Sequence, residues 1–315
     1  MSVLVFSKPF TQQEPISPEA IAEAARVLES GRLHRYNTVD GEDGDTALWE
    51  SEYAAYQGAK YCLATTSGGT AMQIALRAVC VRSGDAILSN AFTLAPVSGA
   101  IAAVGAMPVF VETTANLTID LEDLEAKIKS STARVLLLSH MRGHLADMEA
   151  LCTLLEKHGM LLVEDCAHTM GANWNGIKSG NYGKVACFST QTYKHLNSGE
   201  GGLLTTDDAD IMANAVILSG SYMLFEKHLA RPDRSAFETP RFENPNCSSR
   251  MDNLRAAILR PQLPQLERNI DRWNRRYRIL EEKLRTEANA TVTHQTGKEH
   301  YLGSSLQLIV TSWTD

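Results

Sequence analysis

The sequence predicts an α/β fold: a large domain with a mostly parallel sheet flanked by helices, followed by a smaller C-terminal α+β domain. Short, almost uniformly apolar segments alternate with helix-length segments between residues 61 and 220. Strands that are apolar throughout are typical of a parallel sheet covered on both faces. The length of 315 residues suits one large domain and a smaller one. We expect the N-terminal arm and large domain at residues 1–247 and the small domain at 248–315.

Two helices are predicted before the first strand. Ser17 is expected to cap the first helix, Pro18 occupies its first position and Gly31 ends it. The second helix spans about residues 46–56 and stops at Gly58. The strands predicted after it are 61–64, 86–89, 108–111, 135–139, 160–163, 185–189 and 202–205, and the helices between them include 71–81, 95–104, 121–128 and 148–158.

The chain after the predicted sheet is less regular. Residues 221–247 are rich in proline, arginine and aromatic residues, which indicates either a long functional loop or a lid over the substrate; a solvated loop is an equal alternative, because acids offset its arginines. A long helix is predicted at about 264–286 from apolar residues at helical spacing. Strands are predicted at 290–294 and 305–310.

Composition restricts the class of protein. The formal net charge of −7 gives no support for nucleic acid as a partner. The N-terminus lacks the basic start and long apolar core of a signal peptide, and no apolar run is long enough to span a bilayer. The six cysteines are scattered without a C-x-x-C pair, as in reduced proteins. We therefore expect a cytoplasmic protein that acts on small molecules.

Two residues are candidates for covalent and electrostatic catalysis. The predicted strand 185–189 ends at Ser189, and the polar turn after it carries Lys194 before a glycine-rich bend. The apolar strand 160–163 is followed by Asp165, at the strand end where open α/β sheets bind ligands. Pyridoxal phosphate (PLP) needs a lysine for a Schiff base and a carboxylate that keeps its ring nitrogen protonated. The alternatives are a solvated lysine and a helix-capping aspartate.

A candidate phosphate site lies earlier in the chain. The segment Thr66-Ser67-Gly68-Gly69-Thr70-Ala71 joins a predicted strand to a predicted helix. Backbone N–H groups at a helix N-terminus attract phosphate, and glycine allows a close approach. The segment matches neither the P-loop nor the dinucleotide-binding fingerprint, and a plain connector is an equal alternative.

Four histidines lie in or near these segments. His168 is expected to bond the phenolic oxygen of the cofactor or to stack on its ring, with a structural role as the alternative. His140 and His144 are four residues apart, which suits a metal only on a helix, whereas strand-like residues precede them and a glycine lies between them. We therefore predict no metal site. His195 is expected to point away from Lys194.

Together these segments resemble the DegT/StrS-type sugar aminotransferases, a branch of the fold type I PLP-dependent enzymes in the aspartate aminotransferase superfamily. The resemblance runs in order over about residues 15–266, and this order makes it more specific than any one motif. The matching segments are 67–71, 83–85, 105–111, 140–148, 163–168, 188–194, 198–202, 249–257 and 262–263.

The resemblance implies roles for individual residues. Lys194 is similar to the Schiff-base lysine, which also carries the proton, and Asp165 to the carboxylate on the pyridine nitrogen. His168 matches a position beside the ring, and Phe92 one where a ring stacks on PLP, with core packing as the alternative. The phosphate ligands implied are Gly69, Thr70 and Ser189.

The implied activity is a PLP-dependent aminotransferase. In this family L-glutamate or L-glutamine commonly donates an amino group to PLP, and the resulting form aminates a keto sugar, usually nucleotide-linked. Such reactions serve sugar, cell-surface polysaccharide or secondary-metabolite biosynthesis, and the resemblance implies a homodimer with shared active sites. The presence of Lys194 disfavours the dehydratase branch, which has histidine there.

The sequence also departs from the family pattern. Ser248 replaces the asparagine that contacts the phosphate from the neighbouring subunit, and Arg250 follows it as a candidate substrate residue. Arg142 and His144 stand where the family has an aromatic and a small or amide residue. We expect Arg142 to meet a carboxylate or phosphate, so that the acceptor is not a routine nucleotide sugar; a surface salt bridge is the alternative. The family's small domain continues past 305–310, so an incomplete or minimal one is expected.

Two other functions remain open. Lys194 and Asp165 would equally serve another PLP-dependent reaction on an amino acid, such as racemisation or elimination. Ser248 and the short C-terminal region also fit a non-catalytic PLP-fold protein that acts as a sensor or partner subunit.

Overall fold

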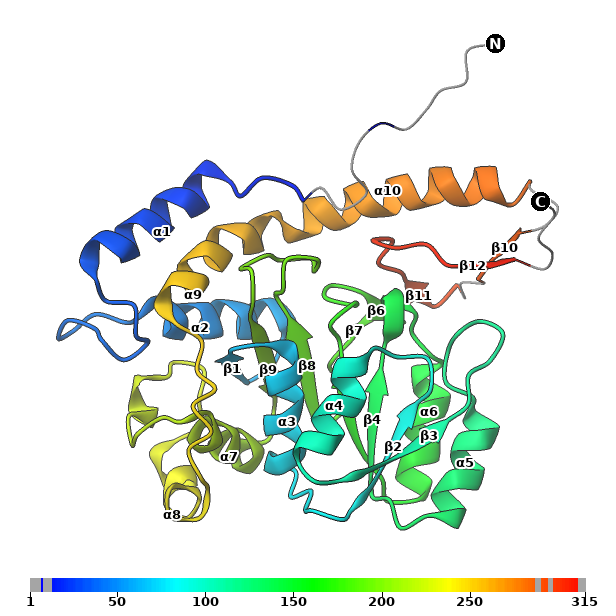
Figure 1. Ribbon diagram of the computed structural model, residues 1–315, viewed down its shortest axis with the longest axis horizontal. Coiled ribbons are helices and arrows are strands. Elements are labelled where there is room, and N and C mark those ends of the chain that lie inside the picture. The colour runs from blue at the N-terminus through cyan, green and yellow to red at the C-terminus, as the bar shows by residue number, and fades with distance from the viewer. Residues whose placement is uncertain (1–6, 8–12, 287–289, 294–296, 311–315) are drawn as a thin grey trace.

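A seven-stranded sheet forms the centre of the structure, a computed structural model that describes residue 7 and residues 13–286, 290–293 and 297–310. The strand order is β1-β9-β8-β5-β4-β2-β3 (Figure 1). Strand β9 is antiparallel to β1 and β8, and the other neighbours are parallel, which confirms the predicted mostly parallel sheet. Its strands are β1 (Tyr61–Thr65), β2 (Ala86–Asn90), β3 (Met107–Val111), β4 (Val135–Ser139), β5 (Leu161–Asp165), β8 (Val185–Ser189) and β9 (Gly202–Thr206).

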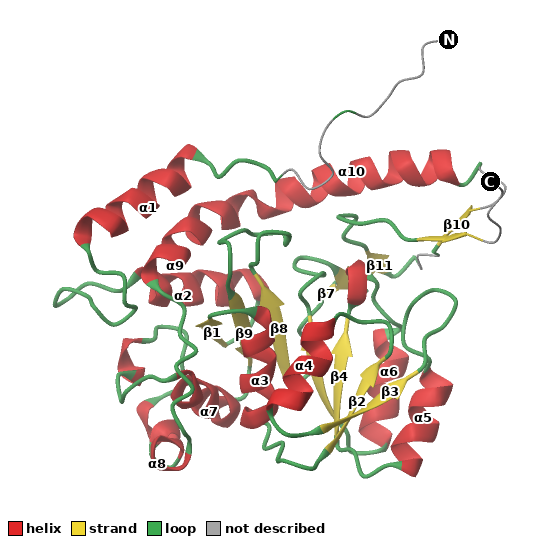
Figure 2. Ribbon diagram, viewed as in Figure 1, coloured by secondary structure: helices red, strands yellow, loops and turns green. Residues whose placement is uncertain are grey.

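Helices cover both faces of this sheet, as predicted (Figure 2). Side chains alternate along each strand, so Leu136 and Leu138 of β4 join one buried cluster and Val135 and Leu137 join the other. The first cluster includes residues of α2, α5, α6 and α9, and the second those of α3, α4 and α7. The helices are α1 (Pro18–Ser30), α2 (Asp45–Gln57), α3 (Gly68–Ala78), α4 (Ala95–Ala103), α5 (Leu121–Ser130), α6 (Met148–Lys157), α7 (Ala209–Ser219), α8 (Pro240–Glu243), α9 (Asn253–Leu259) and α10 (Leu266–Leu284).

Helix α3 begins three residues before the predicted start at residue 71. Ser67 caps the helix, because its Oγ accepts a hydrogen bond of 3.0 Å from the Thr70 backbone N–H. Both glycines of the predicted connector therefore belong to the first helical turn. This turn is the part of a helix whose N–H groups have no partner within the helix.

The segment 221–247 contains three short helical pieces rather than a simple loop. They are η2 (Phe225–Lys227), η3 (Arg234–Phe237) and α8. Phe225 and Phe237 are buried, stack with ring centroids 4.3 Å apart, and belong to the same cluster as α7. Aromatic side chains thus hold this segment against α7, which local patterning did not predict.

The C-terminal part returns to the large domain. Short helix η4 (Arg260–Gln265) leads into α10, which crosses above the edge where β4 and β8 end (Figure 1). The predicted strand 290–294 is observed as β10 (Ala290–Val292), with residue 294 outside the described residues, and 305–310 as β12 (Leu308–Val310). These two strands pair with each other. Strand β11 (Glu299–His300) pairs instead with β6 (Asn173–Trp174), which in turn pairs with β7 (Ile177–Lys178).

A buried charged network joins three distant segments. The two terminal nitrogens of the Arg35 guanidinium donate to the two Glu50 carboxylate oxygens, at 2.9 and 2.8 Å. Glu50 also accepts from the Ala64 backbone N–H, while His228 lies 3.1 Å from Glu50 and 2.8 Å from the Tyr36 hydroxyl. All of these side chains are buried and have lost their contacts with water. The hydrogen bonds and ion pairs within the network therefore have to offset the free-energy cost of that lost hydration.

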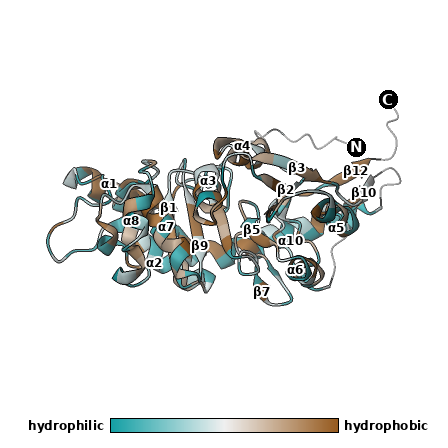
Figure 3. Cartoon of the chain, turned by 90° about the horizontal axis from the view of Figure 1, so that it is seen from below, coloured by the Kyte–Doolittle hydropathy of each residue, from teal (hydrophilic) through white to brown (hydrophobic). Residues whose placement is uncertain are grey.

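Apolar segments gather in the middle of the molecule, where β5 and β9 lie (Figure 3). Among the helices that the structure describes, none is both long and apolar enough to cross a membrane. Some apolar side chains nevertheless remain outside the core, at the edge strand β3 and before α4: Met107 is 63% exposed, Phe110 43% and Leu94 38%.

Candidate active site

Lys194 lies on the loop between β8 and β9, above the edge of the sheet. Backbone hydrogen bonds close this loop from Thr190 to Gly201 and from Thr192 to Gly199. The Lys194 side chain is half-buried, and its Nζ lies 2.9 Å from His168 Nε2. The structure therefore brings together two of the predicted site residues and excludes a freely solvated lysine.

Burial and neighbouring charges control the protonation of this pair. Burial lowers the pKa of Lys194; Asp165 opposes this shift and Arg142 adds to it. Burial lowers the pKa of His168 to about 3, and the neighbouring Lys194, His195 and Arg142 add to this shift. His168 is therefore neutral near pH 7. Its Nε2 accepts a hydrogen bond from the Lys194 ammonium, which places the imidazole proton on Nδ1.

Asp165 ends β5 with its carboxylate buried. One oxygen accepts from Ser139 Oγ at 3.1 Å, and the other accepts from the Ala167 backbone N–H at 3.1 Å. Burial raises the pKa of Asp165, while these hydrogen bonds and the neighbouring Lys194 and His140 act in the opposite direction. A positive group placed against this carboxylate would therefore favour its ionised form.

Two residues that the sequence reasoning missed hold Asp165 in place. Asn90, at the end of β2, donates to the Ser139 carbonyl at 3.0 Å and accepts from the Ser139 N–H at 2.8 Å. Ser139, at the end of β4, then bonds Asp165. Both residues carry the signal that identified Asp165, since each is a polar residue at the end of an apolar strand. Their side chains link three strand ends.

The predicted phosphate residues also meet at one point. A Cβ on Gly68 would lie 2.9 Å from the Ser189 Cβ, so α3 begins directly against the end of β8. A Cβ added to Gly69 would lie at least 3.8 Å from every other side chain and backbone atom around it. The space beside Gly69 is therefore open, and a ligand can reach the N-terminus of the helix. The Thr70 hydroxyl lies 2.9 Å from Ser67 Oγ in the same turn. Free N–H groups, an open glycine and nearby hydroxyls are what a bound phosphate requires.

A cavity of about 500 Å³ opens beside Lys194. His168 and Arg142 line it with Lys194, and its other walls are the N-terminal segment 13–17 and one side of α10. Of the described residues that line the cavity, none comes from 221–247. This segment therefore does not contribute to the cavity within the same chain.

Arg142 and His144 occupy different environments. Arg142 has a left-handed backbone (φ 60°), and its carbonyl accepts from the Tyr301 hydroxyl at 3.2 Å and from Ser305 Oγ at 3.1 Å. Its side chain is exposed to the cavity. His144 is buried instead, with Nε2 2.8 Å from Gln307 Oε1. The structure thus places Arg142 beside Lys194, and His144 against the C-terminal segment.

The other predicted site residues are Phe92, Ser248 and Arg250. Phe92 follows β2 and is half-buried, and Asn90 bonds its carbonyl at 2.9 Å. Ser248 is exposed and bonds Asn246, and Arg250 donates to the Gly220 carbonyl at 2.9 Å. Ser248 and Arg250 are not among the described residues that line the cavity with Lys194, and the backbone of Arg250 pairs with Thr65 at the end of β1, just before Ser67.

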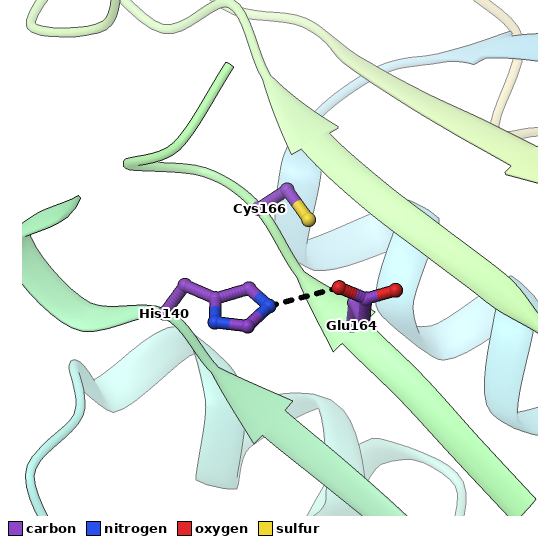
Figure 4. Close-up of side chains that lie close together, drawn as sticks. All are labelled: His140, Glu164 and Cys166. Carbon is purple, nitrogen blue, oxygen red and sulfur yellow. Dashed lines mark hydrogen bonds and ion pairs between the residues drawn. The ribbon is translucent and has the colours of Figure 1, made fainter. Parts of the chain in front are cut away.

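His140, Glu164 and Cys166 come close enough together to suggest a metal site (Figure 4). Glu164, however, already accepts four hydrogen bonds: one from His140 at 2.9 Å and three from the backbone N–H groups of residues 180, 182 and 183. A carboxylate offers about four lone-pair positions, so this one is fully used. The cluster therefore fixes the loop behind β5 through hydrogen bonds.

His195 faces away from the Lys194–His168 contact. Its Nε2 lies 2.9 Å from Ser304 Oγ, and its ring packs against Trp273 at 5.3 Å. Burial and the Lys194 charge lower the pKa of His195 to about 3. This agrees with the predicted orientation and links the Lys194 loop to α10.

Comparison with known proteins gives a consistent family match. The model of the DegT/DnrJ/EryC1/StrS aminotransferase family matches residues 15–314. A pleiotropic regulatory protein of Geobacillus stearothermophilus is 31% identical over 85% of this chain and 66% of its own length. The L-glutamine:2-deoxy-scyllo-inosose aminotransferase of Streptomyces fradiae is 35% identical over 64% of this chain and 46% of its own length. The chain thus spans between about half and two thirds of these relatives.

Solved structures share the fold. 3-Amino-5-hydroxybenzoic acid synthase is 27% identical and superposes with a TM-score of 0.80 over 94% of this chain and 74% of its own. DesV of S. venezuelae, solved with a ketimine intermediate, is 30% identical with a TM-score of 0.75, over 93% of this chain and 74% of its own.

Proposed function

Because the chain belongs to the DegT/DnrJ/EryC1/StrS aminotransferase family, we propose that it is a PLP-dependent aminotransferase. It transfers an amino group from an amino acid, L-glutamate or L-glutamine, to a keto sugar or related keto substrate in sugar, polysaccharide or secondary-metabolite biosynthesis. Relatives named for the glutamine-dependent amination of inososes support this substrate class. The observation that carries the proposal is the half-buried Lys194 amine, which contacts His168 within the electrostatic reach of Asp165.

The residues present fit PLP. Its phosphate suits the open N-terminus of α3 at Gly69 and the hydroxyls of Thr70 and Ser189. The buried Asp165 carboxylate would face the protonated ring nitrogen, whose positive charge opposes the rise in pKa that burial causes. Lys194 would hold the aldehyde carbon. When bound, PLP supplies an electron-accepting ring next to the amino carbon.

The chain's own groups then perform the proton transfers. The lowered pKa of Lys194 makes deprotonation of its ammonium easier, and the resulting amine can act as a nucleophile and as a base at the substrate Cα. His168 stays neutral, so its Nε2 orients the amine without adding a competing positive charge. Asn90 and Ser139 keep Asp165 aligned.

We further propose a cytoplasmic homodimer with shared sites, in which each chain comprises a large domain at 1–247 and a small domain at 248–315. Ser248 is exposed and does not line the cavity of its own Lys194, so its hydroxyl is available to the site of a second copy. The exposed apolar side chains of Leu94, Met107 and Phe110 offer a surface for association between copies.

A visible spectrum tests the proposed function. After incubation with PLP, the protein should show a yellow band, and L-glutamate or L-glutamine should bleach it; a keto acceptor should then restore it. A band that neither amino acid changes would favour another PLP-dependent reaction, such as racemisation or elimination. Complete absence of a band would favour the non-catalytic sensor or partner subunit, a role that the regulatory name of one relative also suggests.

Asp165→Asn is expected to lower the rate of the amino-donor half-reaction by roughly 10²-fold or more, because the charge opposite the ring nitrogen disappears. Stability should be unchanged or higher, because burial disfavours the native carboxylate. Stopped-flow absorbance and thermal unfolding measure the two quantities. Asp271→Asn, on the exposed side of α10, is the matched control. An equal rate for both variants would contradict the role of Asp165.

Arg142→Ala is expected to lower kcat/KM for at least one substrate by about tenfold, the effect typical of losing a charged hydrogen bond. Because Arg142 contributes to the lowered pKa of Lys194, the pH profile should also move to higher pH. Arg134→Ala, an exposed arginine before β4, should change neither quantity. If Arg142→Ala left the kinetics unchanged for every accepted substrate, a role of Arg142 in substrate binding would be contradicted.

A further inference from the structure

The cavity beside Lys194 continues into a cationic region that the proposed chemistry does not use. Arg268 and Arg272 line it from α10. Because they are four residues apart on one helix, their side chains project from the same face. Glu14 is the one acid among the described residues that line the cavity.

Glu14 neutralises only part of this charge. Its carboxylate forms an ion pair with the Arg272 guanidinium, and the two side chains are 59% and 38% exposed. A pair this exposed contributes little to stability, so another anion can replace it. Arg272 Nε is buried and has no hydrogen-bond partner within the described part of the chain. Arg268 pairs with no acid among the residues that the structure describes.

The segment that carries Glu14 is a separate wall of the cavity. Residues 13–17 precede α1, and they line the cavity together with the Lys194 loop and α10. The Glu14 carboxylate therefore occupies a position that a ligand entering the cavity can also reach. The Arg272 guanidinium can bind a carboxylate through its two terminal nitrogens.

We propose that Arg268 and Arg272 form a subsite for a distal carboxylate of a substrate whose reacting carbon lies at Lys194, and that Glu14 occupies this subsite until the substrate arrives. The inference rests on the proposed function for the role of Lys194. A cavity of about 500 Å³ has the size of a small-molecule site. The substrate class is a dicarboxylate or an acid with a remote carboxylate, which displaces Glu14 from Arg272.

Binding of a non-reactive dicarboxylate tests the subsite without turnover. Isothermal titration with glutarate should give at least tenfold tighter binding than butyrate, equivalent to about 1.4 kcal/mol. Arg272→Gln should remove this preference, and Glu14→Gln should strengthen glutarate binding. Arg278→Gln, an exposed arginine on α10 outside the cavity lining, should match wild type. Equal glutarate affinity for wild type and Arg272→Gln would overturn the proposal.

The two half-reactions identify which substrate carries the carboxylate. If the amino donor does, Arg272→Gln should lower kcat/KM for L-glutamate and leave L-glutamine unchanged, because the distal amide of glutamine is neutral. If the keto acceptor does, only the second half-reaction should change. If the wild-type protein turns over nothing but binds glutarate in an Arg272-dependent way, the subsite stands and the proposed activity fails.

Discussion

Lys194→Ala is expected to lower the rate of the amino-donor half-reaction by about 10³-fold or more, because one residue provides both the nucleophile and the proton carrier. No other lysine among the described residues that line the cavity can replace it. The yellow band of the PLP-treated protein should also be lost or displaced. Single-turnover absorbance with L-glutamate measures both effects.

Lys60→Ala provides the matched control for this substitution. Lys60 is exposed before β1, and only its backbone N–H forms a described hydrogen bond, with Asp207. This variant should keep the wild-type band and rate. A Lys194→Ala protein that retained both would show that another group performs the chemistry. Loss of stability is not expected, because the Lys194 side chain contacts only His168 through a described hydrogen bond.

Glu50→Gln is expected to lower the free energy of unfolding by about 3–5 kcal/mol, because it leaves the buried Arg35 guanidinium without a countercharge. Urea denaturation followed by circular dichroism measures this change. Glu52→Gln lies on the same helix and removes a partly exposed ion pair with Arg260, which should matter by about 1 kcal/mol or less. Similar effects of the two substitutions would show that the buried network does not stabilise the fold.

The same network predicts a dependence of stability on pH. Burial alone would oppose ionisation of Glu50, but Arg35 and His228 outweigh it and lower its pKa to about 2, from an ordinary value of 4.5. A carboxylate with a lowered pKa stabilises the fold above its unfolded pKa and loses this contribution as pH falls. Wild-type stability should therefore decline more steeply than that of Glu50→Gln between about pH 4.5 and 2. Parallel curves would contradict the charged state of Glu50.

Much of the sheet was predictable because its signals are local. Each predicted strand of the central sheet is an apolar run bounded by polar or glycine residues, and its observed counterpart agrees to within one or two residues, whereas β12 begins three residues later than predicted. The start of α3 was predicted too late, because glycine was interpreted as a break although Ser67 caps the helix before it. The irregular segment 221–247 was described only by composition, since its order comes from Phe225 and Phe237 packed in the core.

In the candidate site, too, some features were predictable from the sequence and others were not. Lys194 and Asp165 were identified from the sequence because both stand just after apolar strands, and parallel strands bring their ends to one edge. The contacts of their side chains were not predictable, because they depend on loops that meet only after packing. The Lys194–His168 hydrogen bond and the Asn90–Ser139–Asp165 chain belong to this second group.

The sequence by itself determined the alternation of strands and helices, the edge of the sheet where chemistry is expected, and the residue types found there, because periodicity and turn chemistry act over a few residues. Only the tertiary structure decided which charges face one another. Arg142 meets the cavity while His144 turns to the C-terminal segment, and Glu14 reaches Arg272 across more than 250 positions of chain. These pairings follow from long-range packing, because packing determines how deeply each charged group is buried. Burial in turn determines the pKa of the group and the strength of its interaction with neighbouring charges.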